Sequence, residues 1–141
     1  MSAQYVIGID LGTTNSVLAY AALSEEKPEV KVLPIPQLVS ANTLESRPVL
    51  PSFLYLATKE ETAANTYSVP WSSIASEAVG YVARNLSAEF PERTVGAAKS
   101  WLCHSKVDRH QPILPWQAPD TVDKVSPVTA SQRYLEHLIS A

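Results

Sequence analysis

A short polar stretch near the N-terminus, Asp10 to Ser16 ("DLGTTNS"), interrupts an otherwise apolar run. Gly12 can adopt backbone angles that other residues avoid, and it lets a ligand approach the main chain closely. Thr13 and Thr14 add hydroxyl donors to the successive backbone N–H groups of such a turn, and together these donors suit an anion. Asp10 would repel a phosphate there unless a cation lay between them, and Mg²⁺ commonly bridges phosphates to a carboxylate. The stretch is therefore a candidate magnesium–phosphate site, and a tight hairpin with ordinary polar turn residues is the alternative.

Two widespread phosphate-binding motifs are absent from the chain. There is no G-x-x-x-x-G-K-[ST] sequence, which excludes a P-loop, and no G-x-G-x-x-G that opens a helix, which excludes a Rossmann turn. Here the glycine turn leads to another β-rich segment, so a hairpin would have to present the donors.

The elements that must position this turn are predicted to be strands. Gln4 to Leu11 is almost continuously apolar, which predicts a central strand buried on both faces. Ser16 to Leu23 follows after a gap short enough for an antiparallel hairpin. Glu29 to Ile35 predicts a third strand, which Pro34 and Pro36 end because proline cannot donate to a ladder.

Strand, loop and helix signals alternate after the third strand. Gln37 to Arg47 is polar and irregular, whereas Arg47 to Thr58 regains strand character. Lys59 to Pro70 is predicted to be a loop. Ser72 to Glu89 is the strongest predicted helix, because its apolar residues recur at helical spacing. These residues are Ile74, Ala78, Val79, Val82 and Leu86.

Lys99 is a second candidate for chemistry, on a helix predicted over Glu92 to Cys103. An apolar stripe on this helix consists of Val95, Ala98 and Leu102. Lys99 follows Val95 by four residues, so it should point from the same face. A lysine at such a position either serves a buried anion site or packs its stem on the core while its ammonium reaches water.

The last segment, Ser126 to Ala141, carries clear helix-start signals. Ser126 is a natural N-cap and Pro127 occupies the first helical position. The apolar face is predicted to consist of Val128, Leu135, Leu138 and Ile139. Because the chain stops inside this helix, we expect that face to find little to pack on. The preceding loop, residues 104–125, should tuck its "ILPW" onto the core.

Composition sets limits on the function. The 141 residues suffice for a domain with a real core, and the 11 basic and 14 acidic residues form no basic stripe, which argues against nucleic-acid binding. No apolar run approaches the roughly 20 residues that a membrane span needs, and the N-terminus is no signal peptide. A single cysteine, Cys103, fits a reducing compartment, so the expected location is the cytoplasm.

Other chemistry-bearing residues give weaker signals. Cys103, His104 and His110 are three possible metal ligands without a paired motif, and zinc usually needs four. Cys103 is expected to be a buried, inert thiol. The three tryptophans are expected in or over the core: Trp71, Trp101 and Trp116.

The segment "IGIDLGTTNS" closely resembles the first phosphate loop of the seventy-kilodalton heat-shock chaperone (DnaK) family, within the actin and sugar-kinase superfamily. Further resemblances follow in the family's order, from Tyr5 to about Ile139. They are "LPSFLYL" for the Thr-Pro-Ser strand, "VGYVAR" for the Val-Gly-x-x-Ala-Lys helix, "FPERTVGAAKSWL" for the lysine-bearing segment and "SPVTASQRYLEHL" for the Ser-Pro helix.

The resemblance implies an α/β fold, with antiparallel hairpin strands and flanking helices forming part of an actin-like (ribonuclease H-like) ATPase lobe. Residues 1–38 would supply core-subdomain strands with the first phosphate loop. Residues 39–125 would form the outer subdomain of lobe I, and residues 126–141 would start the helix returning to the core. The second phosphate loop, the adenosine site, lobe II and the peptide-binding domain have no counterpart, which implies a truncated, divergent member.

The resemblance also implies roles for individual residues, with ATP or ADP and Mg²⁺ as cofactors. Asp10 would hold water around Mg²⁺ and is the implied metal residue. Gly12, Thr13, Thr14 and Asn15 would cradle the β- and γ-phosphates, with Thr13 at the γ end. Lys99 would contact the γ-phosphate and position the attacking water, so Lys99, Asp10 and Thr13 are the implied catalytic residues.

The implied function is that of an ATP-hydrolysing chaperone of the DnaK type, with unfolded peptide segments and co-chaperones as partners of the full-length form and with no nucleic-acid or membrane partner. The chain alone is expected to be inactive. Leu50 in place of threonine, Ser100 in place of arginine and the Pro-rich loop depart from the family pattern. The alternatives are a sugar kinase or another actin-like ATPase, and a non-catalytic actin-like module or inactive fragment.

Overall fold

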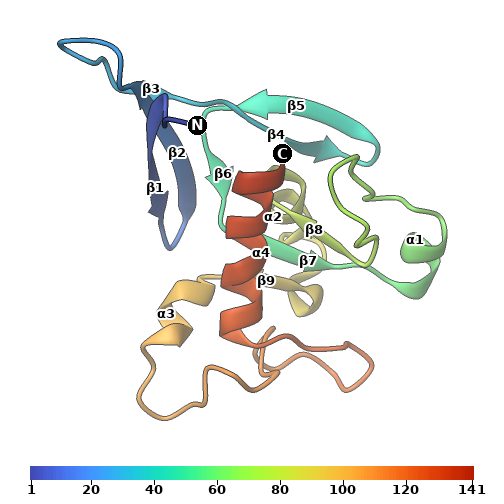
Figure 1. Ribbon diagram of the computed structural model, residues 1–141. Coiled ribbons are helices and arrows are strands. Elements are labelled where there is room, and N and C mark those ends of the chain that lie inside the picture. Colours follow the sequence, from blue (N-terminus) through green and yellow to red (C-terminus); the bar gives the residue numbers. More distant parts are fainter.

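Three antiparallel sheets and four α-helices form a mixed α/β fold (Figure 1). The computed structural model describes residues 1–141. The α-helices are α1 (Lys59–Ala63), α2 (Tyr81–Leu86), α3 (Ala98–Leu102) and α4 (Pro127–Ser140), with one 3-10 helix, η1 (Pro91–Arg93). The strands are β1 (Tyr5–Leu11), β2 (Asn15–Ala22), β3 (Lys31–Val32), β4 (Ile35–Ser40), β5 (Thr43–Arg47), β6 (Leu50–Pro51), β7 (Phe53–Leu56), β8 (Glu77–Val79) and β9 (Thr94–Gly96). None of the helices combines the length and the apolar character that crossing a bilayer requires.

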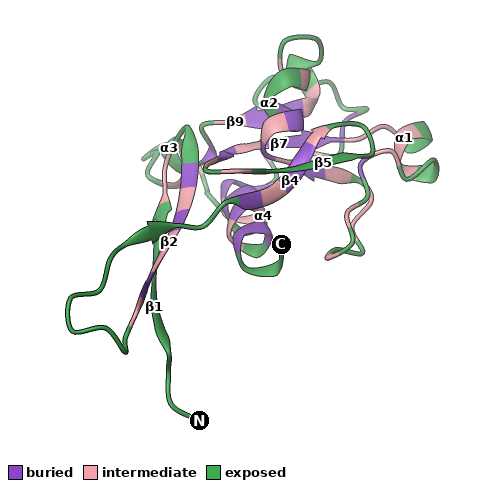
Figure 2. Ribbon diagram, turned by 90° about the horizontal axis from the view of Figure 1, so that it is seen from above, coloured by how far each residue is buried: buried purple, intermediate pink, exposed green.

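The first sheet contains the predicted hairpin. β1 pairs with β2 along its whole length, from Tyr5 opposite Ala22 to Leu11 opposite Ser16. β2 also pairs with the short strands β3 and β6 on its other side. The expectation that β1 is buried on both faces is wrong, because β2 is its only neighbour and its residues are exposed (Figure 2).

The second sheet is a hairpin that the sequence did not predict. β4 and β5 pair from Ile35 opposite Arg47 to Ser40 opposite Thr43, in the segment expected to be irregular. Of the third predicted strand, only β3 (Lys31–Val32) forms before Pro34. Pro36 lies inside β4 and does not end a strand. A two-stranded sheet has only edge strands, so a proline N atom can face away from the ladder at no cost in hydrogen bonds.

The third sheet has the order β8-β7-β9, and its strand β8 lies within the segment predicted to be the longest helix. β8 and α2 divide this segment, and Gly80 separates them with a φ of 94°. A Cβ atom on Gly80 would lie 2.6 Å from Leu50 Cδ1 and 2.7 Å from Gln37 Oε1, so the helical pattern cannot continue through it. The predicted helix is confirmed only at α2. It was wrong at β8, because pairing with β7 is a long-range interaction that periodicity does not detect.

Gln37 connects these sheets from a fully buried position in β4. Its Nε2 donates to the carbonyls of Val49 (2.9 Å) and Ile35 (3.3 Å), and its Oε1 accepts from the Tyr81 N–H (3.0 Å). One buried amide therefore satisfies main-chain groups of three separate segments.

The loop predicted after β7 contains a short helix instead. Thr58 and Glu61 form a reciprocal capping box at the start of α1. Glu61 also accepts from the Tyr55 hydroxyl at 3.0 Å. Burial, followed by the effects of Glu61, raises the pKa of the Tyr55 phenol, which therefore stays a donor at neutral pH.

α4 confirms the predicted helix and its cap, since the Ser126 hydroxyl accepts from the Thr129 N–H at 3.0 Å. Its buried face differs from the predicted one, and Ile139 is exposed. The buried residues are Pro127, Ala130, Ser131, Tyr134, His137 and Leu138. This face packs against α3, β7 and β8, so the expectation that the helix has little to pack on is wrong.

The central strand β7 has a core on each face. Leu54 and Leu56 join Tyr134 of α4 in one cluster, whereas Tyr55 joins Val82 of α2 in another. This alternation is the period of a strand, and it places α4 and α2 on opposite faces of the sheet. The long loop contributes Leu114 to the α4 side, as predicted for its "ILPW" segment, while Trp116 remains exposed.

Candidate functional site

The hairpin turn between β1 and β2 consists of Gly12, Thr13 and Thr14. A Cβ atom on Gly12 would lie 2.1 Å from the Asn15 carbonyl oxygen, so no other residue fits without moving the main chain. The turn therefore depends on glycine because of a close approach between two backbone segments, as the sequence suggested.

A buried serine fixes the carbonyl side of this turn. The Ser52 Oγ donates to the Gly12 carbonyl and the Ser52 N–H donates to the Thr14 carbonyl, both at 2.8 Å. Ser16 Oγ lies 2.9 Å from Ser52 Oγ. Because the single Ser52 hydroxyl hydrogen goes to Gly12, Ser16 is the donor of this second bond. Two buried hydroxyl groups thus hold the turn in one conformation.

The backbone N–H groups of the turn have no hydrogen-bond acceptor within the chain. The backbone N–H groups of Gly12, Thr13 and Thr14 donate to no group of the chain. The side chains of Thr13, Thr14 and Asn15 are exposed and also lack a partner in the chain. The turn thus offers three successive unpaired N–H groups, while Ser52 binds the carbonyls of Gly12 and Thr14. Successive free backbone N–H groups suit an anion.

Asp10 lies in β1, two residues before Gly12 and opposite Val17 of β2. Its side chain is exposed and forms no ion pair. No three His, Cys, Asp or Glu side chains are grouped so as to hold a metal ion. A lone carboxylate does not form a protein cage for magnesium, but it fits the usual way in which magnesium keeps its waters and binds one carboxylate plus phosphates.

Lys99 is carried by α3 rather than by the longer helix predicted for it. Val95 lies in β9, and Ala97 precedes α3 with a left-handed φ of 53°. The argument that Lys99 shares a helical face with Val95 is therefore wrong, and Lys99 is exposed without an ion pair. α3 nevertheless lies beside the turn end of the β1–β2 hairpin (Figures 1 and 2), and Leu11 and Trp101 pack on the same core cluster.

The residues after α3 form no metal site. Cys103 is exposed, which corrects the expectation of a buried thiol. His104 stacks on Trp101 at 5.2 Å between ring centroids, and Trp101 stacks on Trp116 at 4.9 Å. Cys103 is the C-cap residue of α3.

Sequence reasoning missed Ser16 and Ser52 as residues that shape the site. Both are buried, at 0% and 1% exposure. The available signal was a serine inside the apolar segment "LPSFLYL", since a buried hydroxyl needs partners. Those partners could not be named because Ser52 and Gly12 are 40 residues apart.

A scan of the chain against models of known protein families found no match.

Proposed function

We propose that the turn at Gly12–Thr14 binds the phosphates of a magnesium nucleotide, and that this chain supplies one wall of the cleft of an actin-like (ribonuclease H-like) ATPase. The observation that carries the proposal is the set of three unpaired backbone N–H groups on a turn whose carbonyls Ser52 ties inward. Such donors are preorganised, so anion binding requires little further ordering.

The residues around the turn fit ATP or ADP with Mg²⁺. Thr13, Thr14 and Asn15 offer exposed polar side chains next to the free amides. When bound, magnesium supplies charge neutralisation between the phosphates and the carboxylate of Asp10. Asp10 would orient the water molecules of that ion, and the amides of the turn would hold the phosphate oxygens.

Lys99 would provide the cation that phosphoryl transfer requires. The proposed role is to stabilise charge on the γ-phosphate and to orient the attacking water, since positioning and charge neutralisation dominate this chemistry. Its support is the place of α3 beside the turn and the free ammonium of Lys99. The resemblance to the heat-shock chaperone (DnaK) family favours ATP hydrolysis coupled to peptide binding over transfer to a sugar.

One wall alone holds a nucleotide weakly. The turn is exposed, so water competes for every donor and the adenosine finds no second surface. We expect that the 141-residue chain neither hydrolyses ATP nor binds it tightly. Sub-micromolar binding by this chain would contradict the one-wall part of the proposal.

The proposal can be tested on the chain itself by amide NMR during a titration with Mg-ATP and, separately, with inorganic triphosphate. We expect millimolar binding, with the largest shifts at the amides of Gly12, Thr13 and Thr14. Ser52→Ala should weaken these shifts because it frees the Gly12 carbonyl, whereas Ser46→Ala, an exposed serine of β5, should not. Shifts that avoid the turn would refute the site.

Hydrolysis is a separate question, to be answered in a form of the protein that contains both walls of the proposed cleft. Lys99→Ala should lower ATP turnover by about 10²-fold or more if the ammonium stabilises the transition state. Lys106→Ala, another exposed lysine, is the matched control. Equal turnover with and without Lys99 would remove its role and leave phosphate binding by the turn untouched.

A further inference from the structure

A pocket of about 410 Å³ lies between α4, β8 and the segment of residues 67–74. None of its lining residues belongs to the hairpin turn or to α3, so it stands apart from the proposed nucleotide site. Its volume falls in the range of small-molecule sites, roughly 300–1,000 Å³. Seven of its 14 lining residues are hydrophobic, and the polar remainder offers groups that could orient a ligand.

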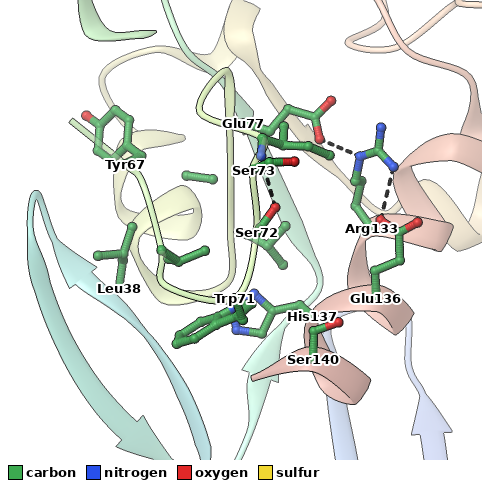
Figure 3. A pocket seen from close by; sticks show the side chains of 14 residues that line it. Leu38, Tyr67, Trp71, Ser72, Ser73, Glu77, Arg133, Glu136, His137 and Ser140 are labelled. Atoms are coloured by element: carbon green, nitrogen blue, oxygen red, sulfur yellow. Dashed lines mark hydrogen bonds and ion pairs between the residues drawn. The ribbon is translucent and has the colours of Figure 1, made fainter. Parts of the chain in front are cut away.

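Two apolar residues and the charged residues of the lining lie on opposite sides of the pocket (Figure 3). Leu38 and Tyr67 stand on one side, and the chain of Glu77, Arg133 and Glu136 stands on the other. Between them the Trp71 ring meets the His137 ring edge to face, at 5.3 Å between centroids. A ligand with a flat apolar body and one polar end would match this division.

The charge of the polar side is negative. Arg133 pairs with Glu77 through Nε at 2.6 Å and with Glu136 through Nη1 at 3.0 Å. One guanidinium thus faces two carboxylates, which leaves one negative charge in excess. The Glu77 side chain is 13% exposed, and its Oε1 accepts no hydrogen bond from the chain. A partly buried carboxylate oxygen without a donor attracts a cationic donor.

His137 adds a second acceptor. Its Nε2 lies 2.8 Å from the Pro36 carbonyl oxygen, which accepts, so Nε2 carries the hydrogen. Nδ1 is then unprotonated in the neutral ring and has no partner in the chain. Burial lowers the pKa of this imidazole, with the Pro36 hydrogen bond opposing the shift, so the ring is neutral at pH 7.

We propose that this pocket binds a small protonated amine with a flat apolar body. The aromatic and aliphatic residues Tyr67, Trp71 and Leu38 would cover the apolar body. The ammonium would face the excess carboxylate charge of Glu77 and Glu136 and the unpaired acceptors on their side of the pocket. Arg133 would keep the two carboxylates in place, and its single positive charge would leave the net charge of the three groups at minus one.

Three ligands with the same phenylethyl body and different charge test the proposal on the full chain: phenethylamine, 2-phenylethanol and 3-phenylpropionate. Amide NMR titrations should show saturable shifts at Trp71, Glu77 and His137. We expect the amine to bind about fivefold more tightly than the alcohol, the gain of one partly solvated charge pair, and the carboxylate to bind most weakly. Equal affinities, or no saturable shift in the pocket with phenethylamine, would overturn the proposal.

A matched pair of variants separates pocket charge from overall charge. Glu136→Gln removes the excess charge at a side chain that is 46% exposed, so the fold should tolerate it. Glu45→Gln removes the same charge from a glutamate of similar exposure, 51%, that pairs with Arg47 outside the pocket. The preference for the amine over the alcohol should disappear in Glu136→Gln and persist in Glu45→Gln. A preference that persists in both variants would overturn the proposal.

Discussion

β1 and β7 are both short apolar strands, yet they have opposite environments. In β1 the side chains of Tyr5, Val6 and Ile7 are each more than half exposed. In β7, Leu54 and Tyr55 are almost completely buried. β7 has a strand on each side and a helix on each face, whereas β1 has β2 alone. Apolar sequence therefore predicts a strand, but the number of neighbouring elements decides whether the strand is buried.

The residues proposed to bind a ligand and the residues that stabilise the fold lie in different parts of the molecule. The turn that offers free amides belongs to the least packed hairpin, while the residue that shapes it, Ser52, lies at the buried junction of β6 and β7. Sites that must admit a ligand need exposed donors, and a rigid support keeps those donors in place. Here the support comes from the well-packed part of the chain.

The largest expected effect comes from truncating one core residue on β7. Leu54→Ala should lower the free energy of unfolding by about 2–5 kcal/mol, because it leaves a cavity where the side chain is fully buried. Ile7→Ala on the exposed strand β1 should change it by less than about 0.5 kcal/mol. Urea denaturation of both variants checks the contrast, and similar losses would show that β1 is more buried in solution than described above.

A second substitution removes the buried amide that joins the sheets. Gln37→Leu leaves the Tyr81 N–H and the Val49 carbonyl without partners, at a cost of about 1–3 kcal/mol for each group that stays buried. Gln132→Leu, whose exposed amide bonds only Glu136, is the control and should be nearly neutral. Equal stability of the two variants would show that the Gln37 bonds make no net contribution.

A third substitution should stabilise the chain. Tyr134 is buried, and its hydroxyl oxygen has no hydrogen-bond partner. Burial alone raises the pKa of this phenol, so the group is neutral and still unsatisfied. Tyr134→Phe should raise the free energy of unfolding by about 1 kcal/mol. A loss of stability in thermal or urea unfolding would indicate a partner for the hydroxyl in solution.

The smallest expected effect is a dependence on pH. Because burial holds the pKa of His137 below its ordinary value, the unfolded chain binds this proton more readily than the folded chain. Stability should therefore fall as the pH drops below about 6.5, with a slope below the ~1.4 kcal/mol per pH unit that one proton allows. Urea midpoints at pH 7.5 and 5.5 measure this change. The difference should shrink in His137→Gln but not in His110→Gln, an exposed control.

Local signals in the sequence predicted the elements that local interactions stabilise. Ser126 and Pro127 correctly predicted the start of α4, and the short polar stretch around Gly12 correctly predicted the β1–β2 hairpin. The buried face of α4 differs from the predicted one. Tyr134 and His137 are buried there, whereas a hydrophobic pattern would place Leu135 and Ile139 inside. A side chain with a polar tip can still bury a large apolar body.

Elements that depend on long-range pairing were not predictable in the same way. Residues 72–89 have helical periodicity, yet β8 pairs with β7, and Gly80 turns the chain before α2 begins. Likewise, Val95 pairs with Leu54, which removes it from the helix of Lys99. At the candidate site, the sequence identified the turn residues, because glycine and threonine types carry that signal. It could not identify Ser52 as their anchor, because no local pattern connects positions 12 and 52.

The distance between Gly12 and Ser52 along the chain also sets an order of folding events. Their hydrogen bond spans 40 residues, so the turn cannot reach its final conformation until β6 has docked on β2. Closing such a loop costs entropy that grows only with the logarithm of its length, about 0.6 kcal/mol per doubling. During synthesis on the ribosome, the amide donors would therefore remain unorganised until well after β1 and β2 have emerged. The final form of the Gly12–Thr14 turn therefore depends on Ser52, a residue made 40 positions later than Gly12.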